Sequence, residues 1–396
     1  MKQGWEIKKL GEVCTFQRGL TYSKDDEVEH SNNCVLRSNN IDLDSMSIVL
    51  DELKYINDDF AVSEDKKVKP NTILICMSNG SKQHIGKVAF IDKEYGYAFG
   101  GFMGLIRPNA EVSPKFIYYS CISSSYKHFL AGIGNGANIT NLKFSDLQQY
   151  TLPIPPREEQ ERIVAELDCL SGVIEKKREQ LRELDALAQS IFYQMFGDPI
   201  TNEKDWEIDR LGNMCDISSS KRIYAHEYCE DGIPFYRGKE ITEKSKGNDI
   251  SVELYIAEDR YNELKHKYGV PQIGDILITA VGTIGNIWVV DNNIPFYFKD
   301  GNVLWLQIKD NINPIYFKTL LYNLIDKYKE SMANGCAYSA LTIVNLKEMQ
   351  TNKIPFALQQ EFADKIEAIE KQKELIKQSI TQTEELFNSR MDYYFN

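Results

Sequence analysis

The chain repeats itself once. Residues 5–11, WEIKKLG, return as residues 206–212, WEIDRLG, and the apolar run ILI at 73–75 returns at 276–278. Further matches follow in the same order through both halves. A period of about 200 residues is far longer than the unit of a solenoid, so it indicates two copies of one domain with its connector. Any fold for the first half must therefore also serve the second.

The first part of each copy, residues 1–152 and residues 198–354, is predicted to be a mixed α/β domain. Short β-rich runs lie between turn residues, and longer stretches with helical character follow them. We therefore expect an α/β protein in which two such domains are related by a pseudo-two-fold repeat. The ranges that indicate strands are 72–77, 88–91, 275–279 and 287–290, and those that indicate helices are 114–130 and 314–332.

The second part of each copy, residues 153–197 and residues 355–396, is predicted to be one long helix. Apolar residues recur at alternating spacings of four and three, which is the heptad pattern of a coiled coil. Pro155 and Pro156 favour a helix start, and Gly197 favours its end. The seam residues are Ile163, Leu167, Leu170, Ile174, Leu181, Leu184 and Ile191 in the first helix and Phe362, Ile366, Ile369, Ile376, Ile380 and Phe387 in the second.

Each helix must find another apolar surface. About 40 residues of helix are roughly 60 Å long, which exceeds what a domain of this size can bury. The nearest matching stripe is the helix of the other copy, so we expect the two to pair as an antiparallel coiled coil within one chain. A homodimeric coiled coil and simple packing against the domains are the alternatives.

Composition narrows the class of protein. The formal net charge is −12, which is unfavourable for binding phosphates unless basic groups cluster locally or a partner supplies them. No apolar run is long enough to span a membrane, and no signal peptide begins the sequence. The eight cysteines include no C-x-x-C pair, which is typical of reduced thiols. We therefore expect a cytoplasmic protein with no membrane partner.

The sequence offers no recognisable catalytic or metal site. It contains no G-x-x-x-x-G-K-[ST] phosphate loop and no Asn-Pro-Pro-Tyr motif of an amino-methyltransferase. The five histidines do not have the spacing of metal ligands. We therefore assign no catalytic residue, no metal ligand and no cofactor to this chain.

Several motifs together resemble a known family. The repeated WEI-x-x-LG opening, residues 273–285 (IGDILITAVGTIG), residues 152–160 (LPIPPREEQ) and the heptad helices resemble the specificity (S) subunit of type I restriction–modification systems. The resemblance covers essentially the whole chain. It departs from the pattern at residues 69–75 (KPNTILI) and 354–360 (IPFALQQ), where the second helix lacks the Glu-Gln pair.

The resemblance implies a non-catalytic subunit that recognises DNA. Each α/β domain would read one half of a bipartite sequence in double-stranded DNA, and the coiled coil would set the spacer between the halves. Two methyltransferase subunits would dock on the chain, and restriction/translocase subunits would join the assembly. These partners would bring S-adenosylmethionine, ATP and Mg²⁺.

Polar residues in turns between strands are the candidates for DNA contact. Such turns project side chains into a groove, where Gln can bond adenine and Lys can bond guanine or phosphate. The candidates in the first half are Arg18, Thr21, Tyr22, Lys82, Gln83, His84, Lys87, Asn135 and Asn138. The candidates in the second half are Lys221, Arg222, Arg237, Lys239, Thr283, Asn334, Tyr338 and Ser339.

Arg37 and Arg237 occupy equivalent positions in the two halves, which favours a shared structural or phosphate role over sequence reading. Two other interpretations of the whole chain stay open at this point. It could be the specificity subunit of a type IIB-like enzyme, or a coiled-coil scaffold that binds proteins and no DNA.

Overall fold

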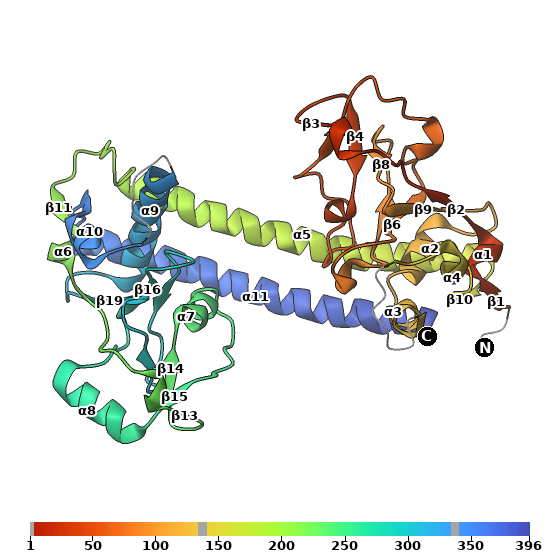
Figure 1. Ribbon diagram of the computed structural model, residues 1–396. Helices are drawn as coiled ribbons and strands as arrows, with labels where there is room; N and C mark the ends of the chain where they lie inside the picture. Colours follow the sequence, from red (N-terminus) through yellow and green to blue (C-terminus); the bar gives the residue numbers. More distant parts are fainter. Residues whose placement is uncertain (1–3, 134–140, 334–339) are drawn as a thin grey trace. The chain divides into compact units, whose positions relative to one another are not determined.

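The computed structural model describes residues 4–133, 141–333 and 340–396, without the side chains of residues 331–333. Packing divides the chain into two units, Met1–Glu179 with Lys377–Asn396, and Gln180–Ile376. Each unit therefore combines one α/β domain with a segment of each of the two long helices (Figure 1).

The described residues of the first unit form three sheets. A two-stranded sheet, β1-β10, pairs the beginning of the domain with its end. An antiparallel sheet has the strand order β2-β9-β6-β7, and a second has the order β3-β5-β4-β8, with β4 and β8 parallel. The strands are β1 Glu6–Lys9, β2 Cys14–Arg18, β3 Glu27–Val28, β4 Asn33–Leu36, β5 Lys54–Ile56, β6 Thr72–Cys76, β7 Val88–Ile91, β8 Ala98–Phe99, β9 Met103–Pro108 and β10 Thr151–Ile154.

Short helices connect these strands, and one differs from the prediction. The single helix expected over residues 114–130 is wrong, because the chain forms one helix that ends at Ser120 and another that begins at Ser124. The Ser123 hydroxyl accepts from Tyr126 N and donates to Ser120 O, so it caps the second helix in place of continuing the first. The helices are α1 Leu10–Val13, α2 Pro114–Ser120, α3 Ser124–Ile133 and α4 Phe144–Leu147, with 3₁₀ turns η1 Lys24–Asp26, η2 Ser38–Asn40, η3 Glu64–Lys66 and η4 Lys82–His84.

The second unit repeats the topology of the first. Its sheets have the orders β11-β20, β12-β19-β16-β17 and β13-β15-β14-β18, which correspond strand by strand to those of the first unit. The strands are β11 Ile208–Arg210, β12 Cys215–Ser218, β13 Tyr228–Cys229, β14 Ile233–Tyr236, β15 Tyr255–Ile256, β16 Ile276–Thr279, β17 Ile287–Val289, β18 Tyr297–Phe298, β19 Val303–Ile308 and β20 Gln350–Asn352. The helices are α6 Leu211–Met214, α7 Gly238–Ser245, α8 Glu258–Tyr268, α9 Pro314–Ala333 and α10 Ile343–Glu348, with a 3₁₀ turn η5 Ala225–Glu227. The duplicated α/β architecture expected from the sequence is confirmed.

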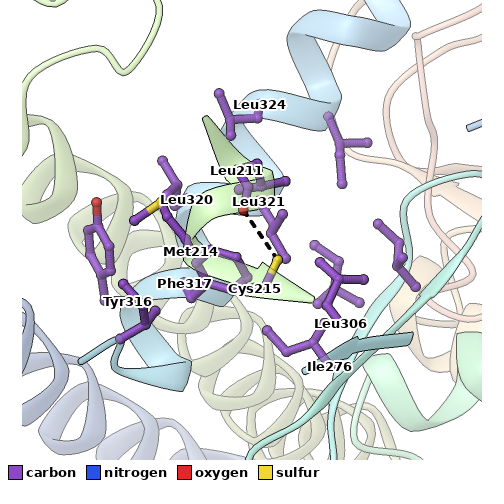
Figure 2. Close-up of a cluster of buried hydrophobic side chains, with 14 of the residues drawn as sticks. Leu211, Met214, Cys215, Ile276, Leu306, Tyr316, Phe317, Leu320, Leu321 and Leu324 are labelled. Carbon is purple, nitrogen blue, oxygen red and sulfur yellow. Dashed lines mark hydrogen bonds between the residues drawn. The ribbon is translucent and has the colours of Figure 1, made fainter. Parts of the chain in front are cut away.

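The core of the second unit lies between its antiparallel sheet and α9 (Figure 2). Phe317 and Leu321 of α9 are fully buried with Ile276 of β16, and Cys215 of β12 lies among them. Burial raises the pKa of the Cys215 thiol to about 12, so the thiol stays protonated, and it donates a hydrogen bond to Leu211 O. This cysteine is therefore a packing residue and not a nucleophile.

The two long helices are α5 Arg157–Phe196 and α11 Phe356–Phe395. Residues 153 and 154, which we assigned to the first helical segment, instead belong to β10. Within the first unit Arg178 pairs with Glu384 at 2.8 Å, while Glu166, earlier on α5, pairs with Arg390, later on α11. The helical segments of this unit are therefore antiparallel.

The helical segments of the second unit are antiparallel as well. Asp185 pairs with Lys373 at 2.7 Å, and Phe192, later on α5, contacts Phe362, earlier on α11. Every predicted seam residue is buried or half-buried. Ile163 and Leu167 also belong to the core of the first domain, and Phe362 and Ile366 to that of the second. The helices therefore pair with one another and pack on the domains, so two of the expected modes operate together.

The polar positions in the seam are matched to one another. Lys177 interrupts the apolar stripe of α5, and its ammonium donates to Ser379 Oγ, to Ser379 O and to Thr383 Oγ1 on α11. Thr383 is itself a polar interruption of the second stripe. A half-buried cation is tolerated here because three oxygen acceptors surround it.

A buried glutamine fixes the start of each long helix to its domain. Gln160 Oε1 accepts from Ser113 N at 2.7 Å, and its Nε2 donates to Pro155 O. Gln359 makes the same pair of bonds, with Asn313 N at 2.9 Å and with Ile354 O. The second helix lacks the Glu-Gln pair of the sequence motif but keeps the glutamine that forms the contacts.

Candidate nucleic-acid interface

The turn between β6 and β7 carries four of the predicted DNA contacts in the first unit. Lys82 and Gln83 in η4 are exposed, and neither forms an ion pair or a side-chain hydrogen bond with the described part of the chain. His84 is half-buried, and burial together with the nearby Lys87 lowers the pKa of its imidazole. The turn thus presents one cation and one amide to solvent.

Lys87 is not available to DNA, which corrects our assignment. Its side chain is buried, and its ammonium donates to Ile41 O at 2.6 Å. Burial lowers the pKa of this ammonium. The equivalent residue in the second unit, Asn286, donates to Thr242 Oγ1 at 3.0 Å. Both residues therefore connect their turn to the segment that follows β4 in the first unit and β14 in the second.

A groove of about 1080 Å³ in the first unit brings together predicted and unpredicted residues. Arg18, Thr21 and Tyr22, which we predict to contact DNA, line it together with Lys24 and Asn79, which the sequence did not single out. Arg37, which we considered only as a matched position, also lines it.

The cations of this groove are not neutralised by carboxylates. Among the described residues, Arg18, Lys24 and Arg37 take part in no ion pair, and all three are exposed. Glu27 and Glu52 also line the groove, and Glu27 is paired with Lys54 at 2.5 Å. The groove therefore offers cationic donors for phosphate and amide groups for base edges.

The equivalent turn of the second unit is differently charged. Arg222 pairs with Asp300 at 2.9 Å, which raises the pKa of its guanidinium. Lys221 is exposed, and its ammonium lies 4.8 Å from the centre of the Tyr268 ring. Thr283 is exposed in the turn between β16 and β17. These three residues are accessible, although one of the two cations already has an anionic partner.

Arg237 and Lys239 are both engaged with carboxylates. Arg237 bonds Glu240 and Glu253, each at 2.8 Å, and Lys239 bonds Glu253 at 2.5 Å. The two cations lower the pKa of Glu253 to about 2. Arg237 N also donates to Glu240, as Arg37 N donates to Asn40 in the first unit, so both arginines begin the segment after the central strand. The shared contact uses the backbone amide, so it fixes the start of the segment without requiring an arginine side chain.

Five further candidates cannot be placed. Asn135, Asn138, Asn334, Tyr338 and Ser339 lie outside the described residues. In the described ranges, no group of three or more His, Cys, Asp or Glu side chains could hold a metal ion. No helix in those ranges is both long and apolar enough to cross a membrane.

Comparison with known proteins identifies both units. The family model described as the type I restriction modification DNA specificity domain matches residues 2–185 and again residues 203–385. The Escherichia coli EcoKI specificity subunit is 28% identical over 203 residues, which are 51% of this chain and 44% of that protein. The Salmonella potsdam StySPI specificity subunit is 30% identical over 184 residues, 46% of this chain and 40% of that protein. The matched regions thus span less than half the length of these two relatives.

Solved structures with the same fold cover nearly the whole chain. The S subunit of the type I restriction–modification system from M. genitalium has a TM-score of 0.55 at 17% identity, over 99% of this chain and 96% of that one. A chain from a study of complex assembly and conformational transition of the type I R-M system has a TM-score of 0.59 at 18% identity, over 99% and 97%. The duplicated sheets, the long helices and the two family matches agree, and the chain belongs to the type I restriction–modification DNA specificity family, with two copies of its domain.

Proposed function

We propose that this chain is the non-catalytic subunit that selects the DNA target of a type I restriction–modification system. The observation that carries the proposal is that the two units share a fold but differ in the side chains that they expose. Their sheet orders are the same, whereas their exposed turns present different side chains. Two domains of one fold with different reading groups suit two different half-sites in duplex DNA.

In this proposal each domain reads one half-site, and the antiparallel helices set the spacer between the halves. The buried Gln160 and Gln359 contacts support it, because they hold the start of each long helix against its own domain. These bonds fix the orientation of each domain relative to the start of its own helix, so no flexible linker separates the two.

Partner subunits supply what the chain lacks. Two methyltransferase subunits would bind S-adenosylmethionine, and restriction/translocase subunits would use ATP and Mg²⁺, all in the cytoplasm where the DNA lies. Each long helix exposes a leucine at an equivalent position, Leu187 of α5 and Leu386 of α11, which are 48% and 50% exposed, and α11 also exposes Leu375. Equivalent apolar positions in both copies suit two copies of the same partner.

A comparison of methylomes tests the proposal. DNA would be sequenced for N6-methyladenine in cells with and without this chain, with the neighbouring methyltransferase gene kept in both. We expect one split, asymmetric motif to disappear with the chain. An unchanged methylome in cells whose methyltransferase is demonstrably active would contradict the proposal and favour a scaffold that does not select DNA.

A further inference from the structure

The turn between β8 and β9 exposes an aromatic ring at the groove of the first unit. Phe102 is 71% exposed, more than any other large apolar side chain in the described residues. It follows Gly100 and Gly101, and all three line the groove that holds Arg18 and Arg37. A phenylalanine left in water forgoes the favourable burial of its ring, so an exposed ring that lines a groove is a candidate for contact with an apolar group.

The backbone under Phe102 is held firmly. Its carbonyl accepts from Met77 N at 2.9 Å and from Ser78 N at 3.2 Å, and Gly100 N donates to Leu36 O at 2.9 Å. Gly19 packs directly on this turn, because a Cβ at Gly19 would lie 2.0 Å from Gly100 O. The exposed ring is therefore displayed from a fixed turn.

The surroundings of the ring favour nucleic acid over an apolar protein surface. Arg18, Lys24 and Arg37 form no ion pair with the described residues, and they line the same groove and suit a phosphate backbone. Asn39 and Asn79 also line the groove. Asn79 Nδ2 donates to Ser38 Oγ at 2.8 Å and Asn39 Nδ2 to Glu52 O at 3.3 Å, so a base edge would bond the remaining donor and acceptor positions of these amides. The apolar ring then lies among groups that fit the backbone and edges of duplex DNA.

The second unit has no aromatic residue in the same turn. Its sequence between β18 and β19 is Lys299-Asp300-Gly301-Asn302, and Asp300 there is paired with Arg222. The turn thus differs between the two domains while the strands on both sides correspond. Side chains that differ on a shared scaffold are those expected to distinguish two half-sites.

We propose that Phe102 is a specificity-determining residue that contacts the 5-methyl group of a thymine in the half-site read by the first domain. In stacked duplex DNA the thymine methyl is the apolar group that the major groove presents. The inference rests on the proposed function, because it needs a half-site that this domain reads.

The test uses the complex of this chain with its methyltransferase subunits and duplexes that contain the motif found in the methylome. Each thymine of the first half-site is replaced in turn by deoxyuridine, which removes only the methyl group. One replacement should slow methylation by the wild-type complex about fourfold, the ratio that burial of one methyl group supplies. In the Phe102→Ala complex the same replacement should have no effect.

Two variants control for trivial causes. Phe102→Leu keeps an apolar side chain and should retain part of the preference for thymine. Ile7→Ala shortens another exposed apolar residue of the first unit, 52% exposed and outside the groove, and should behave as wild type. Since the Phe102 ring is largely exposed, its truncation should leave the reading of the second half-site intact.

The outcomes separate this inference from the proposed function. Methylation that depends on the chain but discriminates thymine from uracil equally in wild-type and Phe102→Ala complexes overturns the role of Phe102. A first half-site without an A·T pair overturns it as well. Absence of any motif that depends on the chain is instead the failure of the proposed function.

Discussion

The two α/β domains share a fold and differ in how they use their cations. In the first, Arg37 is exposed in a groove with Arg18 and Lys24, and these three have no carboxylate partner among the described residues. In the second, Arg237 occupies the position of Arg37 but bonds Glu240 and Glu253. Two equivalent positions thus keep the same residue type. The arginine of the first domain forms no ion pair among the described residues, whereas the arginine of the second domain bonds two carboxylates. The first domain should therefore depend more on phosphate contacts, and the second on its reading groups and on partner subunits.

The largest effect that would sharpen this comparison concerns Lys82 and Gln83. Replacing both by alanine should lower discrimination at the first half-site, measured as the ratio of methylation rates for the correct and a substituted sequence, by about ten- to hundredfold. The reason is that each exposed donor can read a base edge. The second half-site should keep its sequence, as a methylome of the variant would show. Equal loss at both half-sites would break the assignment of one domain to one half-site.

A smaller effect should appear in stability, and only in the second domain. Arg237→Ala leaves the carboxylate of Glu240, which is 2% exposed, with only the bond from the backbone N of residue 237, and it should destabilise the second unit by about 1–2 kcal/mol. Arg37→Ala removes no internal ion pair and should cost less than about 0.5 kcal/mol. Denaturant unfolding followed by tryptophan fluorescence suits the test, since Trp206, Trp288 and Trp305 report on the second unit and Trp5 on the first. Similar destabilisation by both variants would contradict the contrast.

The smallest effect concerns salt. Arg37→Ala should weaken DNA binding by the complex about three- to tenfold and lower the slope of log affinity against log salt by about one. A conservative change at the second domain, Arg237→Lys, should leave that slope unchanged. Fluorescence anisotropy at several salt concentrations measures both. If Arg237→Lys lowered the slope and Arg37→Ala left it unchanged, our interpretation of the two domains would be reversed.

Much of the fold could be predicted because it is recorded in periodicity and repetition. The apolar stripes of the long helices indicated their length and their pairing, and the repeat indicated two domains of one topology. The break after Ser120 was missed because it depends on the hydrogen bonds of one serine, Ser123, which leave the apolar pattern of residues 114–130 unchanged.

The candidate site was less predictable, because tertiary contacts decide whether a polar residue is free. Lys87 follows a glycine in a turn, as an exposed residue would, yet its ammonium reaches Ile41 O, 46 residues away in sequence. Arg237 bonds Glu253, which lies 16 residues later in the sequence, and no periodicity in the intervening residues predicts this contact. Phe102 was missed for the opposite reason, since an apolar residue before a strand predicts burial.

The seam lysine has a consequence for how such genes can recombine. Lys177 meets Ser379 and Thr383, whereas the residues of α5 that correspond to these two are Gln180 and Leu184. A chain assembled from two first halves would set the ammonium against a leucine in place of a hydroxyl, and such a mismatch in a coiled-coil seam opposes pairing. Exchange of an α/β domain between genes would leave the seam intact, while duplication of one half would spoil it. We therefore expect two copies of α5 to pair less well than α5 pairs with α11.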